Sequence, residues 1–229
     1  KNQAWNFGIE TGWVQTDLRF GHGSPDTFSA TATDLGGYAT YLSGGLFVDG
    51  VINANFLNLS DDLPELGAPP VTAGTHGTSW GGQVEAGYQM PIGASAFWEP
   101  VGSLSYVDTT FGSLLVPGGL DQMGGDTSFR GSLGARIGLT QDFQYYKVKF
   151  ALTGRIWDEF ENNPSSTLIV AGGPDFLNND DLKGVFGEVS GQANLFTTTS
   201  GLSAFLTGGI KFKTDYEEGT VTIGARYQW

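Results

Sequence analysis

Two histidines, His22 and His76, are the side chains best suited to general acid–base chemistry in this sequence of 229 residues. Together with a pair of aspartates that positions a water molecule, such a histidine can serve as the general base in peptide hydrolysis. No matching pair of aspartates accompanies either histidine at the ends of the strands expected below, and both histidines lie in expected loops. We interpret each as a solvated loop residue, with proteolysis as the alternative, and predict no catalytic residue and no enzyme activity.

Acidic clusters are the other candidates for chemistry. Asp61, Asp62 and Glu65 form one cluster, and residues 178–181 form another. Both could bind calcium or join phosphate groups through divalent ions, but neither has the ordered ligand spacing of a calcium-binding loop. The sequence contains no nucleotide-binding loop, zinc cluster or nucleophile elbow. We therefore expect solvated loops, no metal site and no cofactor.

The charge of the chain restricts its partners and is unevenly distributed. Eleven Lys and Arg stand against 24 Asp and Glu, and the formal net charge of -13 argues against a nucleic-acid partner, because phosphates would be repelled. Between Phe20 and Phe129 there is no Lys or Arg, whereas most of the basic residues lie from Arg130 onward. Where the acidic first half and the basic second half of the chain lie relative to each other depends on the secondary-structure elements that carry these charges.

Those elements are predicted to be β-strands, as the segment TVTIGARYQW at 220–229 illustrates. Its apolar residues occupy the odd positions, and Thr, Gly, Arg and Gln occupy the even ones. Side chains of a strand alternate between two faces, so one face is apolar and the other polar. This pattern is typical of a transmembrane β-barrel, which is apolar toward lipid and polar toward its lumen.

The same alternation predicts ten strands. We place them near 5–20, 33–43, 46–58, 78–90, 96–109, 128–140, 146–157, 184–196, 202–214 and 220–229. Their connections are alternately short and long, as the periplasmic turns and extracellular loops of outer-membrane barrels are. The predicted fold class is all-β: an antiparallel transmembrane β-barrel of the outer-membrane type, forming a single domain over residues 1–229.

A soluble β-sandwich is the alternative fold, because its strands alternate too. The polar face is rich in Gly and small polar residues, the strands exceed the usual length of about 5–6 residues, and aromatic residues gather at strand ends, all of which favour a membrane. These aromatic residues are Trp5, Phe20, Trp80, Trp98, Trp157, Tyr227 and Trp229.

Composition excludes a helical membrane protein. Hydrophobic residues make up 39% of the chain and mean hydropathy is -0.12, without any stretch of roughly 18 apolar residues. There is no cysteine, so disulfide and thiolate chemistry are absent. The sequence starts at Lys1 and no basic-then-apolar leader precedes Trp5, so we expect a processed chain or a fragment of a longer one.

Five segments are similar in sequence to a known protein family. They are GGYATYLSGGLFVDGVI at 36–52, WGGQVEAGYQMPI at 80–92, AFWEPVGSLSYVDTTFG at 96–112, SFRGSLGARIG at 128–138 and GTVTIGARYQW at 219–229. Together they resemble the translocator barrel of autotransporters, the type V secretion family. The resemblance implies a Gram-negative outer-membrane barrel that anchors and exports an N-terminal passenger. A small passive channel or structural barrel without cargo is the alternative.

The expected partners are outer-membrane lipid and lipopolysaccharide, the outer-membrane assembly machinery and the chain's own passenger. By resemblance, Trp229, with Tyr227 on the same face, corresponds to the terminal aromatic signal that the assembly machinery reads; the alternative is that Trp229 is one girdle aromatic among several. Family members usually have twelve strands and a helical linker in the pore, and residues 8–20 resemble their third strand. Either two strands and the helix are missing from this chain, or ten strands close the barrel and both termini are periplasmic.

Strand parity predicts which charged residues line the lumen. The basic set is Arg130, Arg136, Lys147, Lys149, Arg155, Lys211, Lys213 and Arg226, and the acidic set is Glu10, Asp49, Glu85, Glu99 and Glu188. Consecutive strands are neighbours, so the two halves of the sequence become facing walls, one mainly acidic and one mainly basic. Two interpretations remain open: a transverse electric field across a wet lumen, or inter-strand salt bridges that fill a narrow pore.

Overall fold

The computed structural model describes residues 3–19, 27–63, 71–116, 119–162, 165–170, 176–179, 183–198, 201–214 and 216–227. The regular elements of these ranges are all β-strands. Within them, no helix combines the length and the apolar character needed to cross a membrane.

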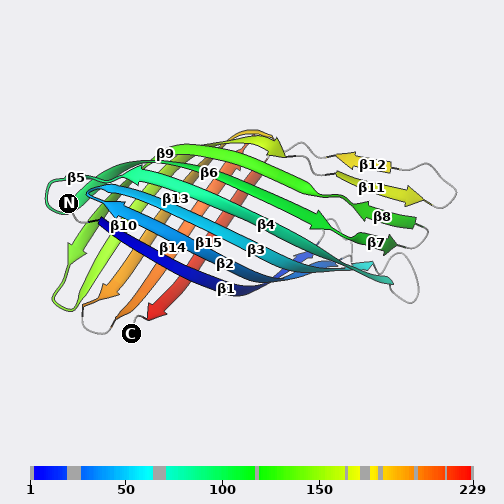
Figure 1. Ribbon diagram of the computed structural model, residues 1–229, viewed down its shortest axis with the longest axis horizontal. Helices are drawn as coiled ribbons and strands as arrows, with labels where there is room; N and C mark the ends of the chain where they lie inside the picture. The colour runs from blue at the N-terminus through cyan, green and yellow to red at the C-terminus, as the bar shows by residue number, and fades with distance from the viewer. Residues whose placement is uncertain are drawn as a thin grey trace.

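Ten long strands of the described chain form one antiparallel sheet, in which each pairs with the next long strand in sequence. They are β1 (Gln3–Arg19), β2 (Thr27–Ser43), β3 (Leu46–Leu63), β4 (Val71–Tyr88), β6 (Ala96–Phe111), β9 (Asp126–Asp142), β10 (Tyr146–Asn162), β13 (Gly184–Thr197), β14 (Leu202–Lys213) and β15 (Tyr216–Tyr227). A short strand, β5 (Met90–Ile92), pairs with the start of β6. The sheet curls strongly, so that β1 to β4 lie in front of β13 to β15 (Figure 1). The prediction of an all-β antiparallel barrel fold is confirmed.

The curled sheet is open along one seam. Its edge strands are β1 and β15, and within the described residues no ladder joins them. One side-chain contact reaches toward the seam: Arg226 of β15 donates a hydrogen bond from Nη2 to the Tyr38 hydroxyl of β2, at 3.1 Å. The described chain is therefore a half-barrel whose first and last strands approach each other without pairing.

The predicted strand limits agree with the structure at the short turns and fall short at the opposite ends. The turn between β2 and β3 lies at 44–45 as predicted, but these strands extend to Thr27 and Leu63 rather than to 33 and 58. Likewise β4 begins at Val71, seven positions before its predicted start. The extension of β2 continues the alternation, with Phe28, Ala30 and Ala32 on one parity, whereas Ser60, Asp61 and Asp62 interrupt it in β3 although the backbone ladder continues.

A second, four-stranded sheet was not predicted. It contains β7 (Ser113–Val116), β8 (Gly119–Met123), β11 (Ser165–Val170) and β12 (Phe176–Asn179), in the order β12-β11-β8-β7. These strands come from two connections that the sequence analysis described only as long, and β8 pairs with β11 to join them. The sheet projects beyond the long-loop end of the half-barrel (Figure 1). Its strands are only four to six residues long, which is too short for a periodicity that could predict them.

The distribution of apolar and polar side chains over the half-barrel is the inverse of that in a soluble protein. On the convex face, Val221, Ile223 and Leu133 are 80%, 81% and 76% exposed. The buried side chains include many polar ones: Thr75, Glu99, Ser103, Ser105, Ser132, Thr153 and Glu159. A sandwich would have buried its apolar parity in a dry core, so the distribution found here excludes that alternative.

Candidate functional site

A network of charged side chains on the concave face is the candidate site. Its members come from alternate positions of β4, β6, β9 and β10, so that they share one face of the sheet. Glu99 stands directly opposite Arg136 in the β6–β9 ladder, and Arg155 stands opposite Glu188 in the β10–β13 ladder. Strand pairing alone therefore places opposite charges beside each other.

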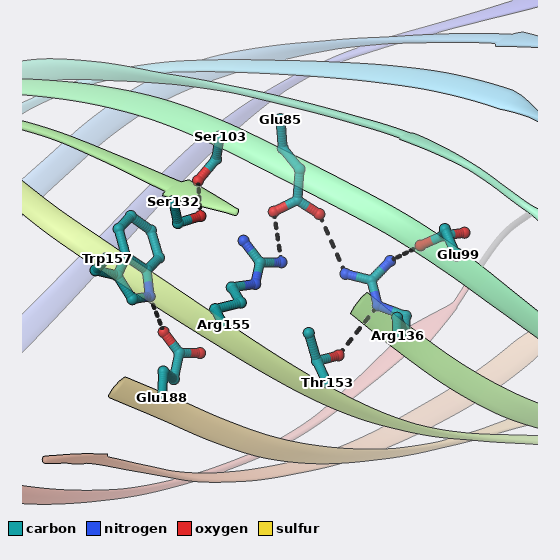
Figure 2. Close-up of polar contacts among 9 residues, drawn as sticks. All are labelled: Glu85, Glu99, Ser103, Ser132, Arg136, Thr153, Arg155, Trp157 and Glu188. Atoms are coloured by element: carbon teal, nitrogen blue, oxygen red, sulfur yellow. Dashed lines mark hydrogen bonds and ion pairs between the residues drawn. The ribbon is translucent and has the colours of Figure 1, made fainter. Parts of the chain in front are cut away.

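Glu85 connects the network across the wall (Figure 2). One carboxylate oxygen lies 3.1 Å from Arg136 Nη2 and the other lies 2.7 Å from Arg155 Nη2. Arg136 also contacts Glu99, through Nη1 at 2.5 Å, and donates from Nε to the Thr153 hydroxyl at 3.2 Å. The two glutamates and two arginines thus compensate one another.

The contact between Glu85 and Arg155 shows on which face the network lies. These residues belong to β4 and β10, and β6 and β9 lie between them in the sheet. Neighbouring strands are about 4.8 Å apart, so three steps separate the two backbones by roughly 14 Å along the sheet. Side chains can bridge that separation only on the concave face of a curled sheet, because those on the convex face diverge.

An aromatic cluster lies beside the network. The Trp157 indole N–H donates to Glu188 at 2.7 Å, and its ring stacks on Phe186 with centroids 5.9 Å apart. The guanidinium groups of Arg130 and Arg155 lie 5.6 and 5.9 Å from the Trp157 ring centroid. Trp157 is only 8% exposed. It was grouped in the sequence with the aromatic residues of strand ends, and the structure instead places it on the concave face, among charges.

The remaining predicted basic residues have separate positions. Lys147 lies at the exposed end of β10 and pairs with Asp142 at 3.1 Å. On β14, Lys211 lies 3.4 Å from Glu218, and Lys213 donates to the main-chain oxygen of Lys183 at 2.6 Å. Lys149 lies over the Phe97 ring, 4.7 Å from its centroid. The structure therefore gathers Arg130, Arg136 and Arg155 into one region, with Lys149 near Glu99 and Arg136, and keeps Lys147, Lys211 and Lys213 apart from it.

The predicted acidic and aromatic residues complete the comparison. Asp49 accepts a hydrogen bond from the Thr40 hydroxyl at 2.5 Å, and the Glu10 carboxylate lies against Gly36. Tyr227 is exposed on the convex side, whereas Trp229 lies outside the described residues.

The histidines do not join this region, and the prediction that His76 lies in a loop is wrong, because it lies within β4, opposite Asn58 of β3. His76 contacts Asn58 at 2.7 Å, and His22 falls outside the described residues, as do the side chains of Asp61 and Asp62. Among the described residues, no group of three or more His, Cys, Asp or Glu is placed to hold a metal ion.

Sequence reasoning missed part of the cluster. Ser103 and Ser132 share a hydrogen bond of 2.7 Å on the concave face, and Phe97 is buried on that face of β6. Phe97 and Trp98 interrupt the apolar alternation, which hid the regular inward and outward alternation of β6. The run Glu99, Ser103, Ser105 on one parity was the signal that could have revealed it.

The convex face carries aromatic side chains in two bands. Trp5 and Trp13 of β1, Trp80 and Tyr88 of β4, and Trp98 and Tyr106 of β6 form pairs eight positions apart, and the four tryptophans and Tyr88 are exposed. Trp80 and Tyr106 of neighbouring strands touch, with centroids 5.4 Å apart. Eight positions span roughly 27 Å along a strand, and a tilt of about 40° reduces this to about 21 Å. This height is close to the ~25 Å apolar band of outer-membrane barrels.

Comparisons with known proteins agree with this geometry. The family model described as Autotransporter beta-domain matches residues 1–209. The crystal structure of the β domain of the Bordetella autotransporter BrkA is similar over 98% of this chain and 83% of its own, with a TM-score of 0.70 and 18% identity. The transport unit of the autotransporter AIDA-I from Escherichia coli is similar over 98% of this chain and 76% of its own, with a TM-score of 0.72 and 12% identity. No curated protein sequence matches the chain.

Proposed function

The chain belongs to the autotransporter β-domain family and is an outer-membrane translocator barrel, and on that premise we propose that its concave face lines the lumen through which its own N-terminal passenger reaches the cell surface. The observation that carries the proposal is the inversion of the two faces. The concave face holds the compensated charges of Glu85, Glu99, Arg136 and Arg155, and the convex face is apolar between two aromatic bands. A wet interior and a lipid-facing exterior require this arrangement.

The lumen lining follows from the same parity. We assign Glu10, Asp49, Glu85, Glu99, Arg130, Arg136, Lys149, Arg155, Glu188, Lys211, Lys213 and Arg226 to it, and Lys147 to its rim. Contacts among Glu85, Glu99, Arg136 and Arg155 support inter-strand pairing on the β4–β10 wall. Neutralising Arg130, Arg136 and Lys149 should change the ion selectivity of single channels if the lumen is wet and leave it unchanged if the lumen is plugged.

Closure of the seam is the step that the membrane demands. An unpaired backbone N–H or C=O in the hydrocarbon costs several kcal/mol, so β1 and β15 must each have a partner strand. Either they pair with each other in a ten-stranded barrel, or two further strands of the protein lie between them. With ten strands closed, both termini would be periplasmic, and Tyr227 and Trp229 would lie where the assembly machinery can read them.

Cysteine pairs distinguish these closures, since the 229 residues contain no cysteine. Ile9→Cys combined with Ile223→Cys or Ala225→Cys tests two of the registers that keep the outward parity of both strands. A disulfide requires Cα atoms within about 7 Å. Direct pairing of β1 and β15 in either of these registers permits one bridge, whereas two intervening strands hold the Cα atoms roughly 14 Å apart and permit neither.

Export of the passenger is tested in intact cells. The full-length protein is expected to expose its passenger to an external protease, and replacing its barrel with an unrelated barrel of similar size should leave the passenger inaccessible. A passive channel, the alternative function, would conduct ions whether or not a passenger is attached. Conductance that is indifferent to the passenger, together with a passenger that never reaches the surface, would favour that alternative.

A further inference from the structure

An apolar groove lies on the convex face, centred on β10, β13 and β14, and has a volume of about 800 Å³. Phe150 and Leu152 of β10 form its wall on one side, and Leu206 of β14 forms the wall on the other. All three side chains are about half exposed. Leu206 stands opposite Ile223, an outward residue of β15. The groove therefore belongs to the lipid-facing surface and is separate from the charged network of the concave face.

The floor of the groove has no side chains at its deepest positions. Gly191 of β13 pairs with Leu152 on one side and with Gly208 of β14 on the other, so two neighbouring strands lack a side chain at the same level. A Cβ built at Gly191 meets no atom within 4 Å, and one at Gly208 meets only the main-chain oxygen of Thr220, at 3.8 Å. The protein itself leaves this space open. An empty space in a bilayer leaves its lining atoms without contact partners, so hydrocarbon enters it.

The groove runs from a short turn into the depth of the membrane. One end is lined by Ile92 and Ala96, which flank the turn between β5 and β6. The other end is lined by Val221, six positions before Tyr227 at the short-turn end of β15. Six positions correspond to a depth of roughly 16 Å when the strand is tilted by about 40°. One leaflet contributes about 15 Å to a hydrocarbon core of about 30 Å, so the groove is as deep as one leaflet.

Aromatic side chains mark the level of the headgroups at the short-turn end. Phe143 and Tyr146 stack at the turn between β9 and β10, with ring centroids 4.6 Å apart, and Tyr145 beside them is 64% exposed. Rings that combine an apolar body with a hydroxyl group favour the boundary between headgroups and hydrocarbon. Lys147 at the same end is paired with Asp142, so recognition depends on the hydrocarbon chain rather than on a phosphate charge.

We propose that this groove binds one acyl chain of a phospholipid from the leaflet on the short-turn side. The groove is continuous with the membrane-facing surface, which hydrocarbon covers, and its depth matches one leaflet. Phe150 and Leu206 hold the chain between them, and the open space over Gly191 lets it approach the backbone of β13. The ligand is thus a lipid held at a defined place on the barrel, with more contact than the surrounding lipids have on a ridged wall.

A photoreactive phospholipid tests the proposal. The full-length protein is folded in phospholipid vesicles that contain a lipid with a diazirine in the middle of its acyl chain, and the adducts are mapped by mass spectrometry of peptides. We expect adducts to concentrate on Leu152 and Leu206. The comparison residue is Ile9, which is 89% exposed, lies outside the groove and is also six positions from the short-turn end of its strand. Exposure and depth alone would label Ile9 at least as strongly.

A substitution that fills the groove gives the sharper comparison. Gly191→Leu should lower the adducts on Leu152 and Leu206 roughly fivefold, as expected when one or two methylene groups of the lipid leave the groove. The matched control, Gly154→Leu, adds the same side chain to β10 outside the groove, where a Cβ also meets no atom within 4 Å, and should leave the adducts unchanged. Heat-modifiable migration on gels confirms that both variants fold, and Gly191→Val replaces Gly191→Leu if the latter does not.

The other outcomes overturn the proposal. Labelling that is equal on Leu152, Leu206 and Ile9, or that Gly191→Leu does not change, would show that the groove holds lipid no differently from the rest of the wall. Efficient disulfide dimers of a Leu206→Cys variant, together with absence of lipid adducts in the groove, would assign the groove to a second copy of the chain. The measurement detects lipid adducts only, so its result is independent of whether a passenger reaches the cell surface.

Discussion

Replacing Glu85 by glutamine should destabilise the barrel more than any other single neutralisation in the network. The Glu85→Gln variant keeps the shape of the side chain and removes the only described carboxylate that contacts Arg155, at 2.7 Å. Arg136 retains Glu99. The Arg155 and Glu85 side chains are 9% and 16% exposed, so the guanidinium left behind is a largely buried charge with no described carboxylate in contact.

The magnitude follows from that burial. Removing one partner of a buried ion pair costs about 3–5 kcal/mol. The partial exposure of Glu85 places the expected loss near the lower limit, about 3 kcal/mol, which is roughly a 150-fold change in the folding equilibrium. Guanidinium unfolding of the barrel in phospholipid vesicles measures it as a shift in midpoint at constant slope.

Two controls isolate the cause. Lys147→Met removes a pair whose members are 49% and 70% exposed and should cost no more than about 1 kcal/mol. The double variant Glu85→Gln, Arg155→Met removes both charges, so it should recover most of the loss and give a large coupling energy. A Glu85→Gln variant within about 0.5 kcal/mol of wild type would mean that Arg155 is fully hydrated, and the argument from burial would be refuted.

Three further variants test other parts of the fold. Leu133→Arg, on the outward face midway between the aromatic bands, should cost about 2–4 kcal/mol in lipid, and a cost near zero would contradict a lipid-facing surface. Gly138→Ala should destabilise by about 1–3 kcal/mol because its Cβ would lie 2.3 Å from an aromatic ring of the next strand, whereas Gly154→Ala, whose Cβ meets nothing within 4 Å, should be close to neutral; equal effects would refute the contact argument. Trp157→Phe keeps the ring but deprives Glu188 of its indole donor, so unfolding should shift by about 1.5–3 kcal/mol, and no shift would show that water replaces the indole.

Alternation predicted the long strands because a lipid-facing wall requires it. On β15, every second residue from Val221 to Tyr227 faces outward and is exposed, as expected from the sequence alone. Between Val71 and Gly77 only Val71 and Ala73 are apolar, so the alternation is too weak to reveal that β4 starts at Val71 instead of 78. The strands β7, β8, β11 and β12 pair with one another over only four to six residues each, which is too short to show a period. Short paired strands of this kind have no recognisable alternation of apolar and polar residues.

Strand parity predicted which face carries the charged residues, but it could not predict which of them contact one another. Parity placed Glu85, Arg136 and Arg155 on one face, yet it could not tell that one carboxylate serves two arginines. That arrangement depends on curl, since β4 and β10 are not neighbours in the sheet. Trp157 was misjudged for a related reason: a tryptophan near a strand end resembles a girdle residue, and only its contacts with Glu188 and the arginines place it inside.

The uneven charge of the sequence acquires a physical meaning in this curl. With no Lys or Arg between Phe20 and Phe129, the strands β2 to β6 have no cation of their own, and most of the chain's cations lie from β9 onward. Arg136 and Arg155 reach Glu85 and Glu99, whereas no described cation reaches Asp49 on β3. Pairing therefore compensates charges on the β4–β10 wall, whereas Asp49 on β3 accepts a hydrogen bond from the Thr40 hydroxyl. The contacts support inter-strand salt bridges on the β4–β10 wall, and a transverse field across the lumen stays a prediction.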